Sequence, residues 1–378
     1  MTLIAHIADV HLGYAQYGLE EREEDIYQAF EEAIELIARE RAEILLIAGD
    51  LFDSPKPPIK ALIKARDLLK KLRDRGVEIV HVLGDHELPR RLSDLPPTAI
   101  LEGISNHAGL KTIKTKNVII VGLDRTPTST LSNALNELKK LTYEIAGSHE
   151  KKILLAHIPA HRPEKGIELL PIGYDYYALG HEHERKILSK NGVAAAYPGS
   201  MEILSTAEIE SWMRNGKGFL LVDFSSFEPI IHEVNLKSIR PQKIVEAEVA
   251  NLEKALEELD EWMKAFEKKP VVHVRVAGRA LDRAAISRRI QEKLLGKALY
   301  YRHEILEEEI EEPEIETAKS LDLKSLIKEY MAAKGASREE IELTAEIYDA
   351  FIAGGADEVE KVILKKIEEA EKSEDTLG

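Results

Sequence analysis

The chain has 378 residues and a mass of 42.5 kDa, a length that predicts two or three domains rather than one compact core. It contains no cysteine, which excludes disulfide scaffolds, thiol nucleophiles and cysteine-ligated zinc. It also has no apolar run of about 18 residues, so we expect no membrane span. The opening MTLIAHIADVHLG lacks the basic start and cleavage site of a signal peptide, which predicts a cytoplasmic protein.

The net charge of −16 is concentrated at the C-terminal end of the chain. Residues 301–378 hold 23 acidic and 10 basic side chains, so the rest of the chain is close to neutral. The overall acidity therefore does not exclude a basic groove for nucleic acid in the first part of the chain.

Up to about residue 235, short apolar runs alternate with amphipathic helical stretches, a pattern typical of α/β folds. Helices are predicted at 20–39, 57–75 and 130–146. Strands are predicted at 3–8, 43–48, 77–83, 118–123, 152–156 and 176–179. Further strands at 192–197, 218–223 and 229–234 follow one another without helices, which predicts a partly antiparallel, mixed sheet system.

A domain boundary is predicted near residues 236–242. Strand and helix patterns then alternate over 244–305 as a small βαβαβ unit. An acidic run broken by Pro313 predicts a solvated linker, and the tail predicts two or three helices, with Ser337 and Glu340 as a capping box. The predicted division is 1–238, 239–306, a linker at 307–318 and a helical tail at 319–378.

Five short motifs each follow a predicted strand, where the carboxyl ends of α/β strands converge on a ligand crevice. They are Asp9-Val10-His11, Gly49-Asp50, Gly84-Asp85-His86-Glu87, His157 and Gly180-His181-Glu182-His183. The glycines would let the backbone turn sharply. The motifs supply three carboxylates and four imidazoles, namely Asp9, His11, Asp50, Asp85, His157, His181 and His183. This donor set fits two divalent ions that share a carboxylate, and it suits manganese, iron or zinc.

The order of these motifs resembles that of the calcineurin-like metallophosphoesterases, which usually have Asn where this chain has Asp85. Longer blocks narrow the resemblance to the archaeal DNA double-strand break repair nucleases of the meiotic-recombination-eleven family, which work with an SMC-like coiled-coil ABC ATPase. Those blocks are IADVHLGYAQYGLEEREEDIYQAF, GDLFDSPKPPIKAL, GDHELPRR, ALGHEHERKI, YPGSMEI and GKGFLLVDF. The resemblance implies an α/β fold, in which a mixed β-sheet sandwich flanked by helices is followed by a small βαβαβ DNA-capping domain and C-terminal helices that bind the ATPase.

The resemblance further implies a homodimeric, manganese-dependent nuclease that processes DNA ends, as a 3′–5′ double-strand exonuclease and a single-strand endonuclease. It implies two Mn²⁺ ions per chain. One would be held by Asp9, His11, Asp50 and His183, and the other by Asp50, Asp85, His157 and His181. His86 would be the catalytic residue outside the metal ligands and would give a proton to the leaving alkoxide, with Glu87 orienting it.

Several other residues have two interpretations each. Four residues beside the motifs are expected either to contact DNA phosphates or to form ion pairs with neighbouring Glu, namely Tyr14, Arg22, Arg90 and Arg91. Arginines of the small domain, among them Arg275 and Arg279, fit either a DNA contact or a solvated face. Segments 57–75 and 97–104 could form a homodimer interface or pack on the chain's own sheet. Asp53 is expected to support the ligands, and His161 is not expected to bind metal.

Two other functions are considered on the same sequence observations. A phosphodiesterase or protein phosphatase could share the site, although protein phosphatases typically continue with Arg-Gly after the second acid, where this chain has Ser54-Pro55. A binding module without chemistry is opposed by the complete set of ligands. The chain contains no G-x-x-x-x-G-K-[ST] motif, so any ATPase must be a separate polypeptide.

Overall fold

The computed structural model describes residues 2–89, 91, 93–160, 166–278, 282–307 and 323–374. The chain divides into two compact units, residues 1–307 and 308–378. Among the described residues, no helix is long and apolar enough to cross a membrane. The predictions for Arg90, His161 and Arg279, and those for the linker beyond residue 307, lie outside the described residues.

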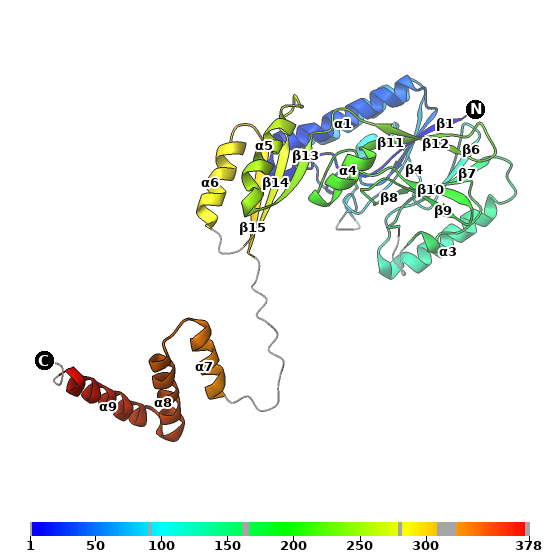
Figure 1. Ribbon diagram of the computed structural model, residues 1–378. Coiled ribbons are helices and arrows are strands. Elements are labelled where there is room, and N and C mark those ends of the chain that lie inside the picture. The colour runs from blue at the N-terminus through cyan, green and yellow to red at the C-terminus, as the bar shows by residue number, and fades with distance from the viewer. Residues whose placement is uncertain are drawn as a thin grey trace. The chain divides into compact units, whose positions relative to one another are not determined.

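Two six-stranded sheets form the centre of the larger unit (Figure 1). The first sheet has the order β12–β11–β1–β2–β3–β4, in which β1 to β4 are parallel and β11 and β12 are antiparallel additions. The sheet is therefore mixed, as predicted. Its strands are β1 (Leu3–Ile7), β2 (Ile44–Ala48), β3 (Glu78–Val82), β4 (Asn106–His107), β11 (Gly218–Asp223) and β12 (Ile230–Asn235).

The second sheet has the order β5–β6–β7–β8–β10–β9 and packs against the first. Between the sheets lie fully buried side chains such as Ile4, Leu46 and Val80 from the first sheet and Ile120 and Leu155 from the second. Each buried side chain of this kind contributes about 1.5–3 kcal/mol. The strands are β5 (Thr112–Thr115), β6 (Val118–Leu123), β7 (Lys151–His157), β8 (Tyr176–Gly180), β9 (Lys186–Lys190) and β10 (Val193–Tyr197).

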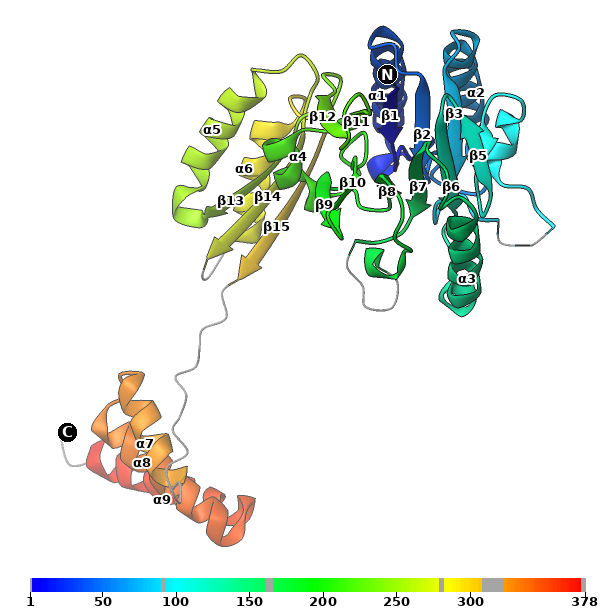
Figure 2. The ribbon, with the colours of Figure 1, turned by 90° about the vertical axis from the view of Figure 1, so that its right-hand side faces the viewer.

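Helices cover the outer faces of both sheets (Figure 2). The first sheet carries α1 (Glu20–Arg39) and α2 (Ile59–Asp74), and the second carries α3 (Thr128–Glu144). In α1 the buried residues recur at helical spacing, which gives the helix one apolar face. A short helix, α4 (Ile209–Asn215), lies between β10 and β11, so the expected absence of a helix there was wrong. The resulting sandwich of two mixed sheets flanked by helices confirms the predicted fold class.

A third, parallel sheet follows, with the predicted βαβαβ order. It consists of β13 (Gln242–Glu248), β14 (Val271–Gly278) and β15 (Tyr300–Glu307), and its helices are α5 (Leu252–Met263) and α6 (Arg283–Leu294). The sheet and its helices enclose their own core.

A buried ionic network joins this small sheet region to the sandwich. Asp25 of α1 is 1% exposed and accepts hydrogen bonds from Arg22 Nη1 at 2.6 Å, Arg240 Nη2 at 3.0 Å and Lys268 Nζ at 3.0 Å. Arg240 and Lys268 come from the segments around β13 and before β14, more than 200 residues from Asp25. One carboxylate therefore holds cations from both parts of the larger unit.

The second unit consists of α7 (Leu323–Ala333), α8 (Arg338–Gly354) and α9 (Ala356–Glu374). The predicted capping box is present, since Glu340 N donates to Ser337 Oγ at 3.2 Å and Ser337 N donates to Glu340 Oε2 at 2.7 Å. Among the side chains described between 323 and 367, only that of Ala345 is buried. This unit therefore has almost no core of its own.

Candidate metal centre

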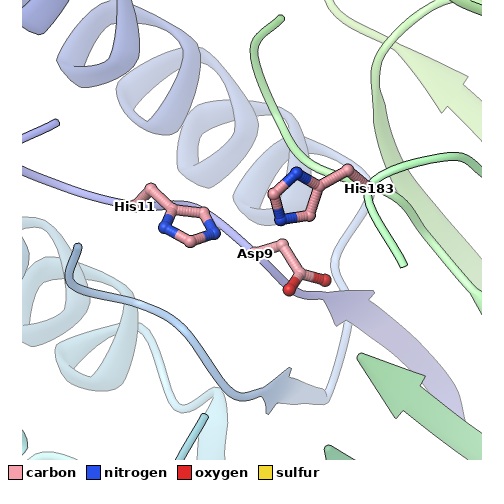
Figure 3. A group of neighbouring side chains, drawn as sticks. All are labelled: Asp9, His11 and His183. Carbon is pink, nitrogen blue, oxygen red and sulfur yellow. The ribbon is translucent and has the colours of Figure 1, made fainter. Parts of the chain in front are cut away.

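The seven predicted donors come from loops at the carboxyl ends of parallel strands in both sheets. They follow β1 (Asp9, His11), β2 (Asp50) and β3 (Asp85), end β7 (His157), or follow β8 (His181, His183). In three overlapping groups, their ligand atoms lie within 4.8 Å of one another, and Figure 3 shows the first of these. The groups are Asp9–His11–His183, Asp9–Asp50–His157 and Asp85–His157–His181. The structure therefore brings all seven donors together.

Much of the backbone at this centre is left-handed. Asp9, His11, Asp50 and His181 have φ angles of 50°, 54°, 51° and 101°. A non-glycine residue in this region costs about 1–3 kcal/mol, and such strain persists where the surrounding structure enforces it. Here the loops are tied to one another, because Asp9 N donates to Gly49 O at 3.1 Å and His11 N donates to Asp50 O at 3.0 Å.

The glycines that precede the donors are needed chiefly for space. A Cβ at Gly84 would lie 2.1 Å from Asp50 Oδ1, and one at Gly180 would lie 1.9 Å from Ala48 O. Only Gly49 combines such a contact with a positive φ, of 87°. The prediction of a sharp turn therefore holds at Gly49, whereas the other two glycines permit close approach of the loops.

Three of the imidazoles are anchored through Nδ1. The Nδ1 atoms of His157, His183 and His11 donate to Ala48 O at 2.8 Å, to Glu208 Oε1 at 3.1 Å and to Asp53 Oδ1 at 3.0 Å, respectively. Metal-ligating histidines typically place their second ring N–H on a carboxylate or carbonyl in this way.

This anchoring frees the Nε2 atoms for a ligand. In the described part of the chain, the buried Nε2 atoms of His11 and His157 have no hydrogen-bond partner. His157 Nε2 lies 3.3 Å from Asp50 Oδ2 and 3.4 Å from Asp85 Oδ2. Buried nitrogen atoms without partners are rare in proteins. Set among carboxylates, these two atoms show that the donor set fits divalent cations.

The charges of the three carboxylates are set by burial and by their partners. Burial opposes ionisation of Asp50, but the charges of the adjacent His157 and His11 imidazoles and the hydrogen bond from the His86 backbone N hold its pKa at about 2. Burial likewise acts on Asp85, but hydrogen bonds from His181 and Arg125 and the charge of His157 keep its pKa well below the usual range. Burial raises the pKa of Asp9. A bound cation would offset the cost of burying these charges.

His86 lies at the edge of this cluster, with a side chain that is 46% exposed. Its Nδ1 donates to the backbone oxygen of Asp53 at 2.9 Å, and its backbone N donates to Asp50 Oδ1 at 2.8 Å. The ring centroids of His86 and His11 are 4.6 Å apart. The ring is thus fixed through Nδ1, and Nε2 remains for a reacting group.

The expectation that Glu87 orients His86 was wrong. Glu87 is fully buried and accepts hydrogen bonds from Phe52 N at 3.1 Å and Gly84 N at 3.2 Å. It therefore joins the loops after β2 and β3, while Asp53 holds the ring of His86. Burial raises the pKa of Glu87 to about 8.

Sequence reasoning missed two groups of supporting residues. Lys217, which is 3% exposed, donates to His183 O at 2.8 Å, to Ser200 Oγ at 2.6 Å and to Glu208, the residue that holds His183. Arg125, in the loop that follows β6, donates from Nε to Asp85 Oδ1. The only sequence signal for Ser200 and Lys217 was that they lie in blocks used for the family resemblance, and Arg125 had no signal.

The residues expected to contact DNA differ in their surroundings. Arg91 is exposed, and half-buried Tyr14 lines a cavity of about 280 Å³ together with Tyr17 and His273. Of the two interpretations of Arg22, the DNA contact was wrong. Its guanidinium is fully buried and donates to Gln16, Asp25 and Ile203 O at 2.9, 2.6 and 2.9 Å, so the ion-pair alternative describes it.

Comparison with known proteins places this site in a family. Residues 2–185 match the family described as calcineurin-like phosphoesterase. The DNA double-strand break repair protein Mre11 of Saccharolobus solfataricus is 35% identical over 315 residues, covering 80% of this chain and 82% of that protein. Mre11 of Methanocaldococcus jannaschii is 32% identical over 368 residues, covering 93% and 94%. Because identity exceeds 30% over most of both chains, this chain belongs to the Mre11 family of DNA double-strand break repair proteins and carries a calcineurin-like phosphoesterase domain.

Proposed function

We propose that this chain is a metal-dependent nuclease that hydrolyses phosphodiester bonds of DNA at double-strand breaks. The observation that carries the proposal is the convergence of seven oxygen and nitrogen donors, among them two buried Nε2 atoms without hydrogen-bond partners. Membership in a family whose relatives are named as DNA double-strand break repair proteins supports DNA as the substrate.

The donors would hold two divalent ions, with Asp50 shared. One ion would take Asp9, His11, Asp50 and His183, and the other Asp50, Asp85, His157 and His181. The grouping of ligand atoms supports this division, and the mixed oxygen and nitrogen set suits Mn²⁺. When bound, such a pair polarises the phosphodiester and activates water.

His86 would supply the proton that the leaving alkoxide needs. Its Nδ1 proton is held by the backbone oxygen of Asp53, so the transferred proton is the one on Nε2. Its exposure gives a DNA strand access to the ring, while the hydrogen bond from its backbone N to Asp50 Oδ1 holds it beside the donors. Positioning of this kind is what makes proton transfer efficient.

We further propose that the enzyme acts in the cytoplasm both as a 3′–5′ double-strand exonuclease and as a single-strand endonuclease. Residues 239–306 would cap the DNA, and Tyr14 and Arg91 would contact its backbone. Exposed Ile59 and Ile63 of α2 support a homodimer interface, because Leu68 and Leu69 of the same helix already pack inside the chain.

The helical tail, proposed as residues 319–378, would bind the coiled coil of an SMC-like ABC ATPase. Support comes from apolar side chains that α7 and α8 leave in solvent, among them Leu323, Tyr330 and Phe351, which are 54%, 62% and 61% exposed. Amphipathic helices with such faces dock on partner helices. Deletion of 319–378 should leave DNA cleavage intact but abolish co-purification with the ATPase. Continued co-purification would contradict the docking role.

A cleavage assay tests the central proposal. The full chain with Mn²⁺ should degrade linear duplex and cut single-stranded DNA, and EDTA should stop both reactions. The Asp50→Asn variant should lose both metal binding and cleavage. A chain that leaves DNA intact but hydrolyses a phosphomonoester or a cyclic nucleotide would instead indicate the phosphatase or phosphodiesterase alternative.

A further inference from the structure

Within the described part of the chain, Asp85 is the one carboxylate of the metal centre that an arginine contacts. Arg125 Nε donates to Asp85 Oδ1, and the two side chains are 19% and 32% exposed. Arg125 is itself fixed, since Nη1 donates to Thr126 O at 2.7 Å and the backbone N donates to Leu83 O at 2.8 Å. The guanidinium is therefore part of the site and does not extend freely into solvent.

The two oxygen atoms of Asp85 have different surroundings. Oδ2 lies 2.9 Å from His181 Nδ1 and 3.4 Å from His157 Nε2, so it is the oxygen that lies among the other donors. Oδ1 is occupied by Arg125. Only one oxygen of Asp85 is therefore available to an ion, and the negative charge of the carboxylate is balanced by the adjacent guanidinium.

We infer that Arg125 makes Asp85 act as a neutral ligand through a single oxygen, as an amide would, and thereby sets the metal affinity of the position shared with His157 and His181. This inference rests on the proposed two-metal function. The number of ligand charges and the rigidity of a site are what tune cation affinity. Arg125 acts on both, so it is a positioning residue and does not itself contact the metal.

The inference predicts that the effects of residues 85 and 125 depend on each other. Asp85→Asn alone leaves the charge of Arg125 unpaired beside the ion, so Mn²⁺ should bind about tenfold more weakly or worse. Adding Arg125→Met removes that charge and should recover most of the affinity. Adding Arg125→Lys in place of Met keeps a cation and should not recover it.

The measurement is calorimetric titration of the full chain with Mn²⁺ alone, without DNA. Arg66→Met is a matched control, because it removes an exposed arginine paired with Asp67 and should leave Mn²⁺ affinity unchanged. Thermal unfolding in EDTA establishes that each variant is folded. A merely structural role for Arg125 would make the double variant bind no better than Asp85→Asn.

Two results would overturn the inference while leaving the proposed function intact. These are an Asp85→Asn variant that binds Mn²⁺ as tightly as wild type, and a double variant, folded like wild type, that shows no recovery. A wild-type chain that binds no Mn²⁺ would overturn the proposed function itself, and this inference with it. The wild-type titration therefore distinguishes failure of this inference from failure of the proposed function.

Discussion

The metal centre and the C-terminal helices differ in where their stabilising contacts come from. In the centre, partners are far apart in sequence, since His157 Nδ1 donates to Ala48 O and His181 N donates to Asp9, pairs separated by 109 and 172 positions. The helices α7 to α9 are held by hydrogen bonds within each helix, one capping box and exposed ion pairs such as that of Lys324 with Asp349, and several of their apolar side chains, among them Tyr330 and Phe351, are exposed. The contrast indicates that contacts within the chain build the centre, whereas the helices leave apolar side chains exposed, as the proposed docking of a partner requires.

The largest effect is expected from His86→Ser, which tests the chemistry of the metal centre. Loss of the proposed proton donor should lower the cleavage rate about 10²–10⁴-fold, because general acid catalysis is of that order. Mn²⁺ binding should be unchanged, since His86 is not among the seven donors. Single-turnover cleavage and metal titration check the two expectations, and retained cleavage would refute the assigned role.

The next largest effect should come from Asp25→Asn, which tests the junction between the sandwich and the small sheet. It leaves Arg240 buried without a charge partner and Arg22 with Glu202 alone, so the free energy of unfolding should fall by about 3–5 kcal/mol. Urea unfolding monitored by circular dichroism measures the loss. Asp67→Asn, which removes an exposed pair, is the control and should change little.

A smaller effect is expected from Glu208→Gln. This variant removes the negative charge of the side chain that holds His183 and keeps the shape of that side chain. Removing such a support typically weakens metal affinity about 10–100-fold. Lys217 would also lose its carboxylate partner. Mn²⁺ titration of the variant checks the expectation. Unchanged affinity would show that His183 is held adequately without that charge.

The junction at Asp25, between the sandwich and the small sheet, also predicts that the free energy of unfolding depends on pH. Burial would raise the pKa of Asp25, but the hydrogen bond from Arg240 and the charges of Arg22 and Lys268 lower it below its usual value. Its contribution is therefore complete above the unfolded pKa of about 3.9 and is lost as pH falls through the lower folded value. Unfolding free energies measured below pH 4 should decline less steeply in Asp25→Asn than in wild type.

The smallest effect on stability is expected in the C-terminal helices α7 and α8. Tyr330→Ser and Phe351→Ser change exposed side chains, so each should shift the free energy of unfolding by no more than about 0.5 kcal/mol. DNA cleavage should be unaffected, while capture of the ATPase should weaken. A large destabilisation would mean that these side chains pack within the chain.

The sequence predicted those strands and donors for which the apolar pattern and the position along the chain both give a signal. Apolar runs located most strands of the two sheets, and residues that directly follow strands, such as Asp50 and His157, meet where parallel strands end. It did not predict β4, β5 or β9, because β4 has two residues, too few for a period, and the side chains of β5 and β9 are largely half exposed. Glu208 and Arg125 were missed because a side chain that supports a ligand is defined by its contacts in space.

The left-handed backbone at Asp9, His11, Asp50 and His181 limits how this protein can be engineered. Stabilisation guided by backbone energetics would place glycine at these four positions, because glycine tolerates that conformation without strain. Each such exchange would relax the chain and remove a donor at the same time. Thermostability and chemistry are thus opposed at these four residues, and improvements in stability must be sought elsewhere in the molecule.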